Sequence, residues 1–450
     1  MKNNQLYTWL WISMFFFTGC ESFLDEKPDQ TLVIPQTLDD FQALLDAEPR
    51  SMNSTSKMGF IASDEAVFSN ALLNLMTLEE RGAYFWEKDI YAPDDAGVDW
   101  SFSYRKIFYA NVVLEGIRDF SPKSVEEEKR ARELEAAAKF YRAMGHFSLA
   151  QQFAQAYNPN QSEQEGIPIR KDADINASSP RVNLKEVYAF ILEDLTENIE
   201  AHPVFPEIAT RPSRWAAEAL LSRIYLSIQD YEKAFEHSGK ALEIKDKLLD
   251  YNDLDLSLRY KFARFHEEVI HYDKMYSGRF TVHNQLLVNP ELYKLYDSLD
   301  LRKGVFFRPS PIKNRFYLAG KYTGDANLFT GLATDEVLLD HAESAVRLGY
   351  DLIAVEDLTY LLANRYLDGN AVSVEGLSGN KLLRKVLEER RKELVYRGIR
   401  WLDLRRLNQD IEFGVTIDRG ENDSEAVLLP NSEGYVFPIP PRELNLNEQF

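Results

Sequence analysis

The chain has a single cysteine, Cys20, among its 450 residues, so no disulfide can form within it. After the N-terminal segment, no apolar run reaches the length of a membrane-spanning helix. Basic residues are also few: 52 Lys and Arg stand against 72 Asp and Glu, and the formal net charge is -20. Such a field repels phosphate backbones, so we do not expect nucleic-acid binding.

The motifs of common catalytic sites are missing too. There is no G-x-S-x-G, Walker A or G-x-G-x-x-G segment. His266 and His271 enclose two glutamates but lie five residues apart, whereas the helical zinc motif needs histidines four apart. Paired acids such as Asp94 and Asp95 fit solvated charge better than a glycosidase pair. We therefore predict that this protein is not an enzyme and holds no metal or cofactor.

The N-terminal segment predicts export and lipidation. A short positive start, an apolar run over 6–17 and two small residues precede Cys20, which is the layout of a secretory signal peptide. Its end resembles the bacterial lipobox, in which the cysteine is acylated, for example with palmitate, and becomes the mature N-terminus. We expect a lipoprotein signal peptide at 1–19, and the acylated Cys20 with a flexible leader at 20–36. The alternative is a signal peptide with a buried thiol.

The remaining residues, 37–450, are expected to form one large folded domain. Hydrophobic residues make up 45% and aromatic residues 12% of the chain, which excludes a disordered protein. Helical patterns dominate 100–245 and 334–406, the expected helical repeat core. Thr37, Ser124 and Asn183 each precede an apolar stripe with an acidic residue three positions later, a signature of helix N-termini.

Residues 214–245 resemble a tetratricopeptide helical hairpin, in which small side chains let two antiparallel helices approach closely. Its turn is expected at Gln229 and Asp230. By contrast, the region of about 250–332 and the Pro-rich tail at 413–450 lack a sustained helical period, and Pro438, Pro440 and Pro441 argue against a regular helix in the tail. The predicted fold is therefore mostly α, with helical hairpins and an irregular, loop-rich half packed on them. Loops on a rigid body commonly carry binding sites, so 250–332 is the expected ligand side.

The segment 382–406 is dense in Arg and Glu around an apolar stripe. Its helix is expected to end at Arg397 and Gly398. We interpret the charges beyond that point, such as Arg400 and Asp403, as pairs that hold the segment against the body, with ligand binding as the alternative.

This segment resembles the C-terminal signature of SusD/RagB-type nutrient-binding lipoproteins, with E-R-R-x-E-L at 389–394 and G-x-R-x-x-D-L-R-R at 398–406. It departs from the signature at Arg397, where an acidic residue usually stands. Other motifs of the family follow in order along the chain: C-x-x-F-L-D at 20–25, W-x-x-x-Y-x-x-I-x-x-x-N at 100–111, R-A-x-x-x-F-x-L-A at 142–150, A-x-x-L-L-S-R-I-Y-L at 217–226 and F-P-I-P at 437–440.

The resemblance implies a SusD-like fold with about four tetratricopeptide-like helical pairs. It further implies a lipid-anchored protein of the outer membrane that faces outwards and is not an enzyme. Such a protein captures an oligosaccharide and delivers it to a SusC-like TonB-dependent transporter, on which it acts as a lid. Two alternatives stay open: a peptide-binding member of the same family, and a repeat scaffold that binds only protein partners.

The resemblance also implies a binding site made of an arc of aromatic rings with a few polar partners. Rings suit sugars because apolar C–H faces stack on them. For each candidate residue the alternative is packing in the core, and Trp100 favours that alternative because it shares helical spacing with Tyr104 and Ile107. Trp86 is the first choice among the candidates, which are Trp86, Trp100, Tyr276, Arg279, Tyr317 and Tyr322.

Overall fold

Thr37–Phe450 form one compact unit. Within the described ranges, no helix is both long and apolar enough to cross a membrane. The expected signal peptide, Cys20 and most of the leader lie outside these ranges, as does Arg279. The computed structural model describes residues 35–47, 51–161, 163–177, 179–276, 278, 280, 286–420 and 426–447.

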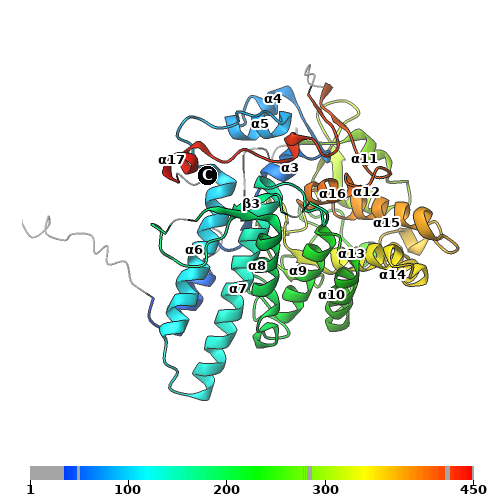
Figure 1. Cartoon of the computed structure of the whole chain (residues 1–450). Coiled ribbons are helices and arrows are strands. Elements are labelled where there is room, and N and C mark those ends of the chain that lie inside the picture. The colour runs from blue at the N-terminus through cyan, green and yellow to red at the C-terminus, as the bar shows by residue number, and fades with distance from the viewer. Residues whose placement is uncertain are drawn as a thin grey trace, which may run out of the picture. The chain divides into compact units, whose positions relative to one another are not determined.

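Helices make up 50% of the structure and strands 9%, which confirms the prediction of a mostly α protein. Most of the longer helices stand side by side in chain order, and each of these packs against the next (Figure 1). They are α6 (Val98–Asp119), α7 (Val125–Phe153), α8 (Leu184–Thr196), α9 (Arg214–Ser227), α10 (Tyr231–Ile244), α13 (Thr334–Arg347) and α14 (Asp351–Ala363).

The helix caps that the sequence predicts are present. Before α2 (Leu38–Leu45), Thr37 and Asp40 form a complete capping box. The side chains of Ser124 and Asn183 each accept a hydrogen bond from the backbone N–H three residues later, at the start of α7 and α8. Each bond satisfies one of the N–H groups that a helix start leaves without a partner in the helix.

Small residues let neighbouring helices approach closely. At Gly145 in α7, an added Cβ would lie 2.6 Å from Cγ1 of Ile107 in α6. The hairpin predicted over 214–245 is confirmed: α9 and α10 pack together, and their turn passes through Gln229, which has a φ of 65°. A side chain is strained at positive φ, and the tight turn fixes it there.

The rest of the unit is built from short elements. A four-stranded sheet has the order β2-β7-β9-β8, and β8 and β9 form an antiparallel hairpin in the region that lacks a helical period in the sequence. The strands are β1 (Ser54–Thr55), β2 (Ala66–Phe68), β3 (Glu165–Pro168), β4 (Arg181–Asn183), β5 (Val269–His271), β6 (Lys274–Met275), β7 (Leu286–Val288), β8 (Phe307–Pro309), β9 (Phe316–Leu318), β10 (Leu332–Ala333), β11 (Ile417–Asp418) and β12 (Val427–Leu428). The other helices are α3 (Met58–Ala62), α4 (Asn70–Leu73), α5 (Leu78–Phe85), α11 (Pro290–Lys294), α12 (Leu301–Phe306), α15 (Gly379–Glu393), α16 (Arg400–Leu407), α17 (Pro441–Leu446) and four 3-10 turns at Ile199–Ala201, Tyr251–Asp253, Leu367–Gly369 and Glu433–Tyr435.

Two helix boundaries differ from the predictions. The helix of the arginine-rich segment ends at Glu393, before the predicted Arg397, and a turn with Tyr396 at a φ of 60° follows. In the tail, Pro441 begins α17. The expectation of no helix there was wrong because proline is tolerated at the first helical position, where its missing N–H has no helical partner to lose.

The arginine-rich signature, residues 389–406, is held by ion pairs against α13 and the start of the domain. Arg390 lies 2.6 Å from Asp340 and 2.9 Å from Asp403, and Arg400 lies 2.7 Å from Asp64. All five side chains are buried. The interpretation of these charges as structural pairs is confirmed.

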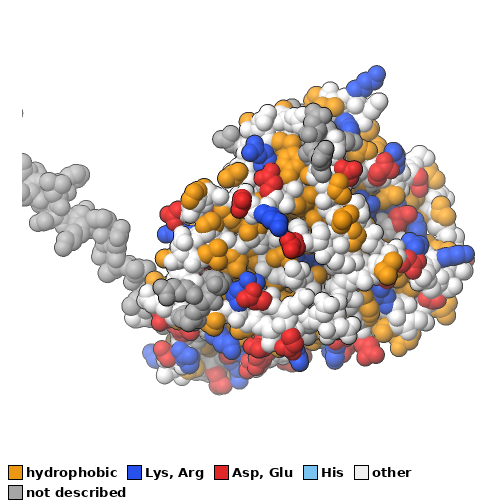
Figure 2. Space-filling view, turned by 45° about the horizontal axis from the view of Figure 1, so that its top comes forward, with side chains coloured by type: hydrophobic (Ala, Val, Ile, Leu, Met, Phe, Trp, Pro, Cys, Tyr) orange, Lys and Arg blue, Asp and Glu red, His pale blue; other side chains and the backbone are white. Residues whose placement is uncertain are grey.

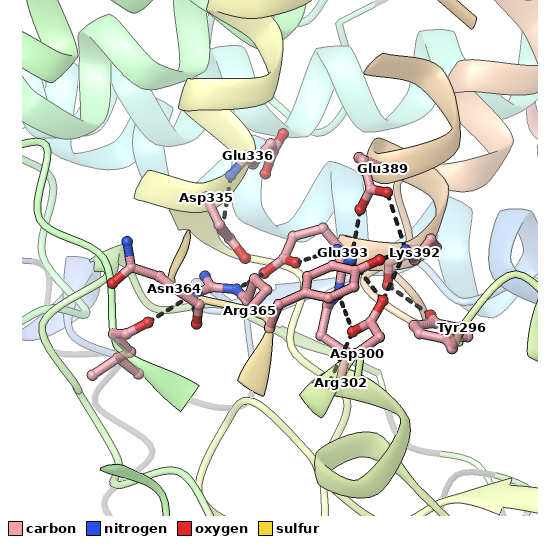
Figure 3. A network of polar contacts seen from close by, with 12 residues as sticks. Tyr296, Asp300, Arg302, Asp335, Glu336, Asn364, Arg365, Glu389, Lys392 and Glu393 are labelled. Atoms are coloured by element: carbon pink, nitrogen blue, oxygen red, sulfur yellow. Dashed lines mark hydrogen bonds and ion pairs between the residues drawn. The ribbon is translucent and has the colours of Figure 1, made fainter. Parts of the chain in front are cut away.

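The same signature reaches a second group of ions, drawn in Figure 3. Arg302 and Arg365, whose side chains have no exposed surface, both contact Glu393, at 3.0 and 2.7 Å. Arg302 also lies 2.6 Å from Glu389 and 2.8 Å from Asp300. Because each charge has an opposite partner, the network can lie in the interior without the cost of an unpaired buried ion.

Candidate functional site

A groove of about 880 Å³ runs along the N-terminal half of α6 and is closed on its far side by residues 168–177, Ser179 and α17. We call it the α6 groove. Its floor and walls include rings, amides and both signs of charge, contributed by Trp100, Tyr104, Arg105, Phe108, Arg170, Asp172, Asn176 and Glu443, among others.

The α6 groove presents apolar surface to solvent. Phe108 is 37% exposed, Ile175 76% and Leu446 73%. Tyr104 is half-buried and its hydroxyl donates to the carbonyl of Pro168 at 2.9 Å, which holds the ring against residues 168–177. Figure 2 shows hydrophobic side chains across the middle of the face it views, while charged side chains are denser along the lower edge. The exposed apolar side chains of the α6 groove suit an apolar or ring-shaped ligand.

A stack of side chains extends from one wall of the groove. The guanidinium of Arg105 lies 4.9 Å from the ring centroid of Phe102, whose ring lies 4.4 Å from that of Tyr276. Within the described chain, Arg105 has no ion pair or hydrogen bond that would occupy its donors, and its side chain is exposed. It can therefore donate to a ligand while the ring beneath fixes its orientation.

Of the six sequence candidates, Trp100 lines the α6 groove, and Tyr276 lies beside it without lining it. Trp100 lies at the base of the groove, is 2% exposed, and packs against Tyr104 at a centroid distance of 4.9 Å. Tyr276 is half-buried and contacts Phe102, the ring on which Arg105 lies, but neither Tyr276 nor Phe102 lines the groove. Trp100 thus shapes the groove floor, and Tyr276 offers part of a ring to solvent.

The other described candidates lie elsewhere. Trp86 is half-buried at the end of α5, where its indole N–H donates to the carbonyl of Ala62 at 3.0 Å. Tyr317 in β9 is half-buried and sits between Leu287 and Arg308 in the sheet. Tyr322 is 6% exposed, and its hydroxyl donates to Glu268 in the interior. None of these three lines the α6 groove.

Several groove residues were not among the sequence candidates. Tyr104, Arg105 and Phe108 follow Ser101 at the spacing i, i+3, i+4 and i+7, which places them on one face of α6. That spacing is visible in the sequence, but the same pattern also marks a helix buried in a core. Residues 168–177 and Ser179, which turn this face into a groove, come from more than 50 residues further along the chain.

The described residues contain no group of three or more His, Cys, Asp or Glu side chains placed to hold a metal ion. His266 and His271 are buried, and burial lowers the pKa of each to about 3, so both are neutral. The ring of His271 packs against Phe140 at 5.1 Å, and that of His266 against Tyr322 at 4.2 Å. Both histidines are part of the core.

Solved structures share this architecture. A SusD superfamily protein from Bacteroides thetaiotaomicron has a TM-score of 0.74 at 19% identity, over 92% of this chain and 98% of that one. A SusD-like carbohydrate binding protein from Bacteroides vulgatus gives 0.71 at 18%, over 92% and 98%. A laminarin binding SusD-like protein gives 0.66 at 20%, over 91% and 96%. The fold is that of the SusD-like proteins.

Family models agree with the fold. Residues 22–226 match the model described as "Starch-binding associating with outer membrane", and residues 334–450 match the model of the SusD family. The chain therefore belongs to the SusD/RagB family of carbohydrate-binding, outer-membrane-associated proteins, which are not enzymes. No curated protein matches the chain.

Proposed function

We propose that this protein captures an oligosaccharide in the α6 groove and passes it to a SusC-like TonB-dependent transporter, on which it acts as a lid. The observation that carries the proposal is that one groove holds the rings of Tyr104 and Phe108 and the guanidinium of Arg105, which has no ion pair within the described chain. The membership in a carbohydrate-binding family and the likeness to a laminarin binding protein support it.

The groove fits the chemistry of a sugar chain. Sugar rings present apolar C–H faces that stack on aromatic rings, and hydroxyl groups that amides, carboxylates and guanidinium groups bind. Phe108 and the half-buried Tyr104 supply rings. Arg105, Asn176 and Glu443 supply donors and acceptors along the same groove.

In this proposal, acyl chains on Cys20 hold the protein at the outer membrane, facing outwards. The lipobox-like sequence before Cys20 and the outer-membrane description of the family support this anchor. Each buried methylene adds about 0.8 kcal/mol, so several chains hold the protein firmly. Metabolic labelling with palmitate should mark the wild type and not Cys20→Ala; label that persists in the variant rules the anchor out.

The test of the groove uses the chain from residue 21 onward, with calorimetry against plant, host and microbial oligosaccharides and an oligopeptide pool. Phe108→Ala should weaken binding of the glycan that binds by roughly tenfold or more, because a stacking ring is lost. Phe205→Ala is the matched control, since Phe205 is 51% exposed on another loop. Equal affinity of Phe108→Ala and wild type places the site elsewhere.

The same experiment separates the alternatives. Trp86→Phe removes the indole bond to Ala62 and should leave affinity unchanged; a loss as large as that of Phe108→Ala would extend the site to α5. Heat from peptides and none from glycans would make this a peptide-binding member of the family. If neither glycans nor peptides bind, protein partners remain as the ligands.

A further inference from the structure

The wall of the α6 groove is held by buried side chains, of which Asn111 lines the groove and the others lie behind the wall. The segment 170–173 forms the part of the wall opposite Tyr104 and Phe108. As a loop without regular secondary structure, it cannot satisfy its own backbone polar groups. What holds it therefore decides whether the groove exists before a ligand arrives.

Side chains of α6 and α7 donate hydrogen bonds to the backbone carbonyls of this segment. The Asn111 amide donates to the carbonyls of Arg170 and Asp172, at 3.1 and 2.8 Å. Arg142 donates to the carbonyl of Lys171 at 3.4 Å. Three successive carbonyls are thus bound by two buried side chains, which are 1% and 8% exposed.

The N–H groups of the segment are bound as well. Nε2 of His146 accepts from the N–H of Arg170 at 3.2 Å, and Glu115 accepts from the N–H of Ala173 at 2.8 Å. His146 must be neutral to accept, and burial lowers its pKa to about 3, which keeps it neutral. Its Nδ1 then donates to the carbonyl of Arg142, 2.9 Å away.

A charge outside the groove completes the chain of contacts. Arg142 donates to Oδ1 and Oδ2 of Asp194 in α8, at 2.7 and 2.8 Å, and to Oδ1 of Asn111 at 2.9 Å. The bidentate pair fixes the guanidinium, and the guanidinium fixes the amide that binds the loop. Asp194 is 5% exposed and does not line the groove.

We propose that Asp194, Arg142 and Asn111 are positioning residues that preform the ligand-binding wall of the α6 groove. The inference rests on the proposed function, and it adds that affinity is set partly by a carboxylate in α8. A wall ordered in advance spares the ligand the cost of ordering it. Two segments that the sequence singles out thus meet at this wall: 100–111 supplies the groove face and Asn111, and 142–150 supplies Arg142 and His146.

The test compares Asp194→Asn with Glu336→Gln. Glu336 forms a similar buried pair with Arg223, at 2.6 and 2.7 Å, far along the chain from the groove residues. Asp194→Asn should lower the affinity for the bound oligosaccharide by about tenfold and speed hydrogen exchange at the amides of Arg170 and Ala173. Glu336→Gln should lower the thermal midpoint without either change. Equal affinity of Asp194→Asn and wild type, or equal losses in both variants, would overturn the proposal.

A second variant covers a failure of Asp194→Asn to fold. Asn111→Ala leaves the pair of Arg142 and Asp194 intact but frees the carbonyls of Arg170 and Asp172. This variant should also speed hydrogen exchange at the amides of the wall, and saturating ligand should restore their protection from exchange. Unchanged exchange at Arg170 and Ala173 would overturn the positioning role. Because exchange is read without ligand, this outcome is distinct from a failure of Phe108→Ala to alter binding, which would count against the groove itself.

Discussion

The arginine-rich signature and the α6 groove both contain arginines, but these arginines differ in exposure and in ion pairing. In the signature, Arg390 has two carboxylate partners and is 3% exposed. In the groove, Arg105 is exposed, stacks on Phe102, and has no carboxylate partner among the described residues. The difference lies in whether the donors of the guanidinium are already used.

This contrast indicates a structural role for the arginine-rich signature. A guanidinium that is buried and fully paired cannot turn to a ligand without leaving a charge unpaired in the interior. One that is exposed and stacked loses little by binding a hydroxyl or a carboxylate. The signature therefore stabilises the fold, and the ligand is expected where pairing is incomplete.

The largest effect should come from breaking the signature network. Glu393→Ala removes a partner from both Arg302 and Arg365, whose side chains have no exposed surface. The free energy of unfolding, measured in urea, should fall by about 3–5 kcal/mol because buried charges lose their partner. Glu388→Ala on the same helix, a 41% exposed partner of Lys385, should change it by less than about 0.5 kcal/mol. Similar losses in both variants would contradict the contrast.

The next effect concerns an incompletely paired carboxyl beside the signature. Burial, together with the nearby Asp64, raises the pKa of Glu65 to about 8, although its Oε1 accepts from the N–H of Tyr396. A raised pKa means that Glu65 contributes stability below about pH 4.5, and that this contribution is lost as the pH rises through 8. Glu65→Gln keeps the acceptor and removes the charge.

This variant should therefore raise the free energy of unfolding at pH 8 by about 2–3 kcal/mol and leave it nearly unchanged at pH 4.5. Urea unfolding at the two pH values measures the difference. Glu433→Gln, at a carboxyl that is 86% exposed, is the control and should show no such dependence. A gain for Glu65→Gln that is the same at both pH values would argue against a neutral Glu65.

The smallest effect should come from the groove side of the comparison. Arg105→Gln should weaken oligosaccharide binding by about tenfold, or about 1.4 kcal/mol, through the loss of a charged donor. It should leave the unfolding free energy within about 0.5 kcal/mol, since no ion pair of the described chain is lost. Arg118→Gln, on the last turn of α6 and 73% exposed, controls for the change of charge. Unchanged affinity in Arg105→Gln would remove Arg105 from the site.

The helical part of the fold could be predicted well. The caps at Thr37, Ser124 and Asn183 and the hairpin at 214–245 are confirmed because they depend on contacts within a few residues. The prediction of no helix in the tail was wrong for a local reason as well, because the rule against proline does not apply to the first turn of a helix. Local rules succeed where local contacts decide.

The site could be predicted only in part. Trp100, near the start of α6, was among the candidates, but the sequence could not rank it above Trp86, Tyr317 and Tyr322. Whether a ring is exposed depends on what packs against it, and those partners lie far away in the chain. Tyr322, for example, meets Glu268, which is 54 residues distant.

The sequence by itself determined the class of the protein, the positions of its long helices, the excess of acidic charge and the candidate lipid anchor at Cys20. The tertiary structure alone decided which arginines are paired and which are open, and that residues 168–177 and Ser179 face α6 to form a groove. The physical reason is that helix periodicity and capping act over three or four residues. Burial and ion pairing instead join residues hundreds of positions apart, as Arg400 and Asp64 do.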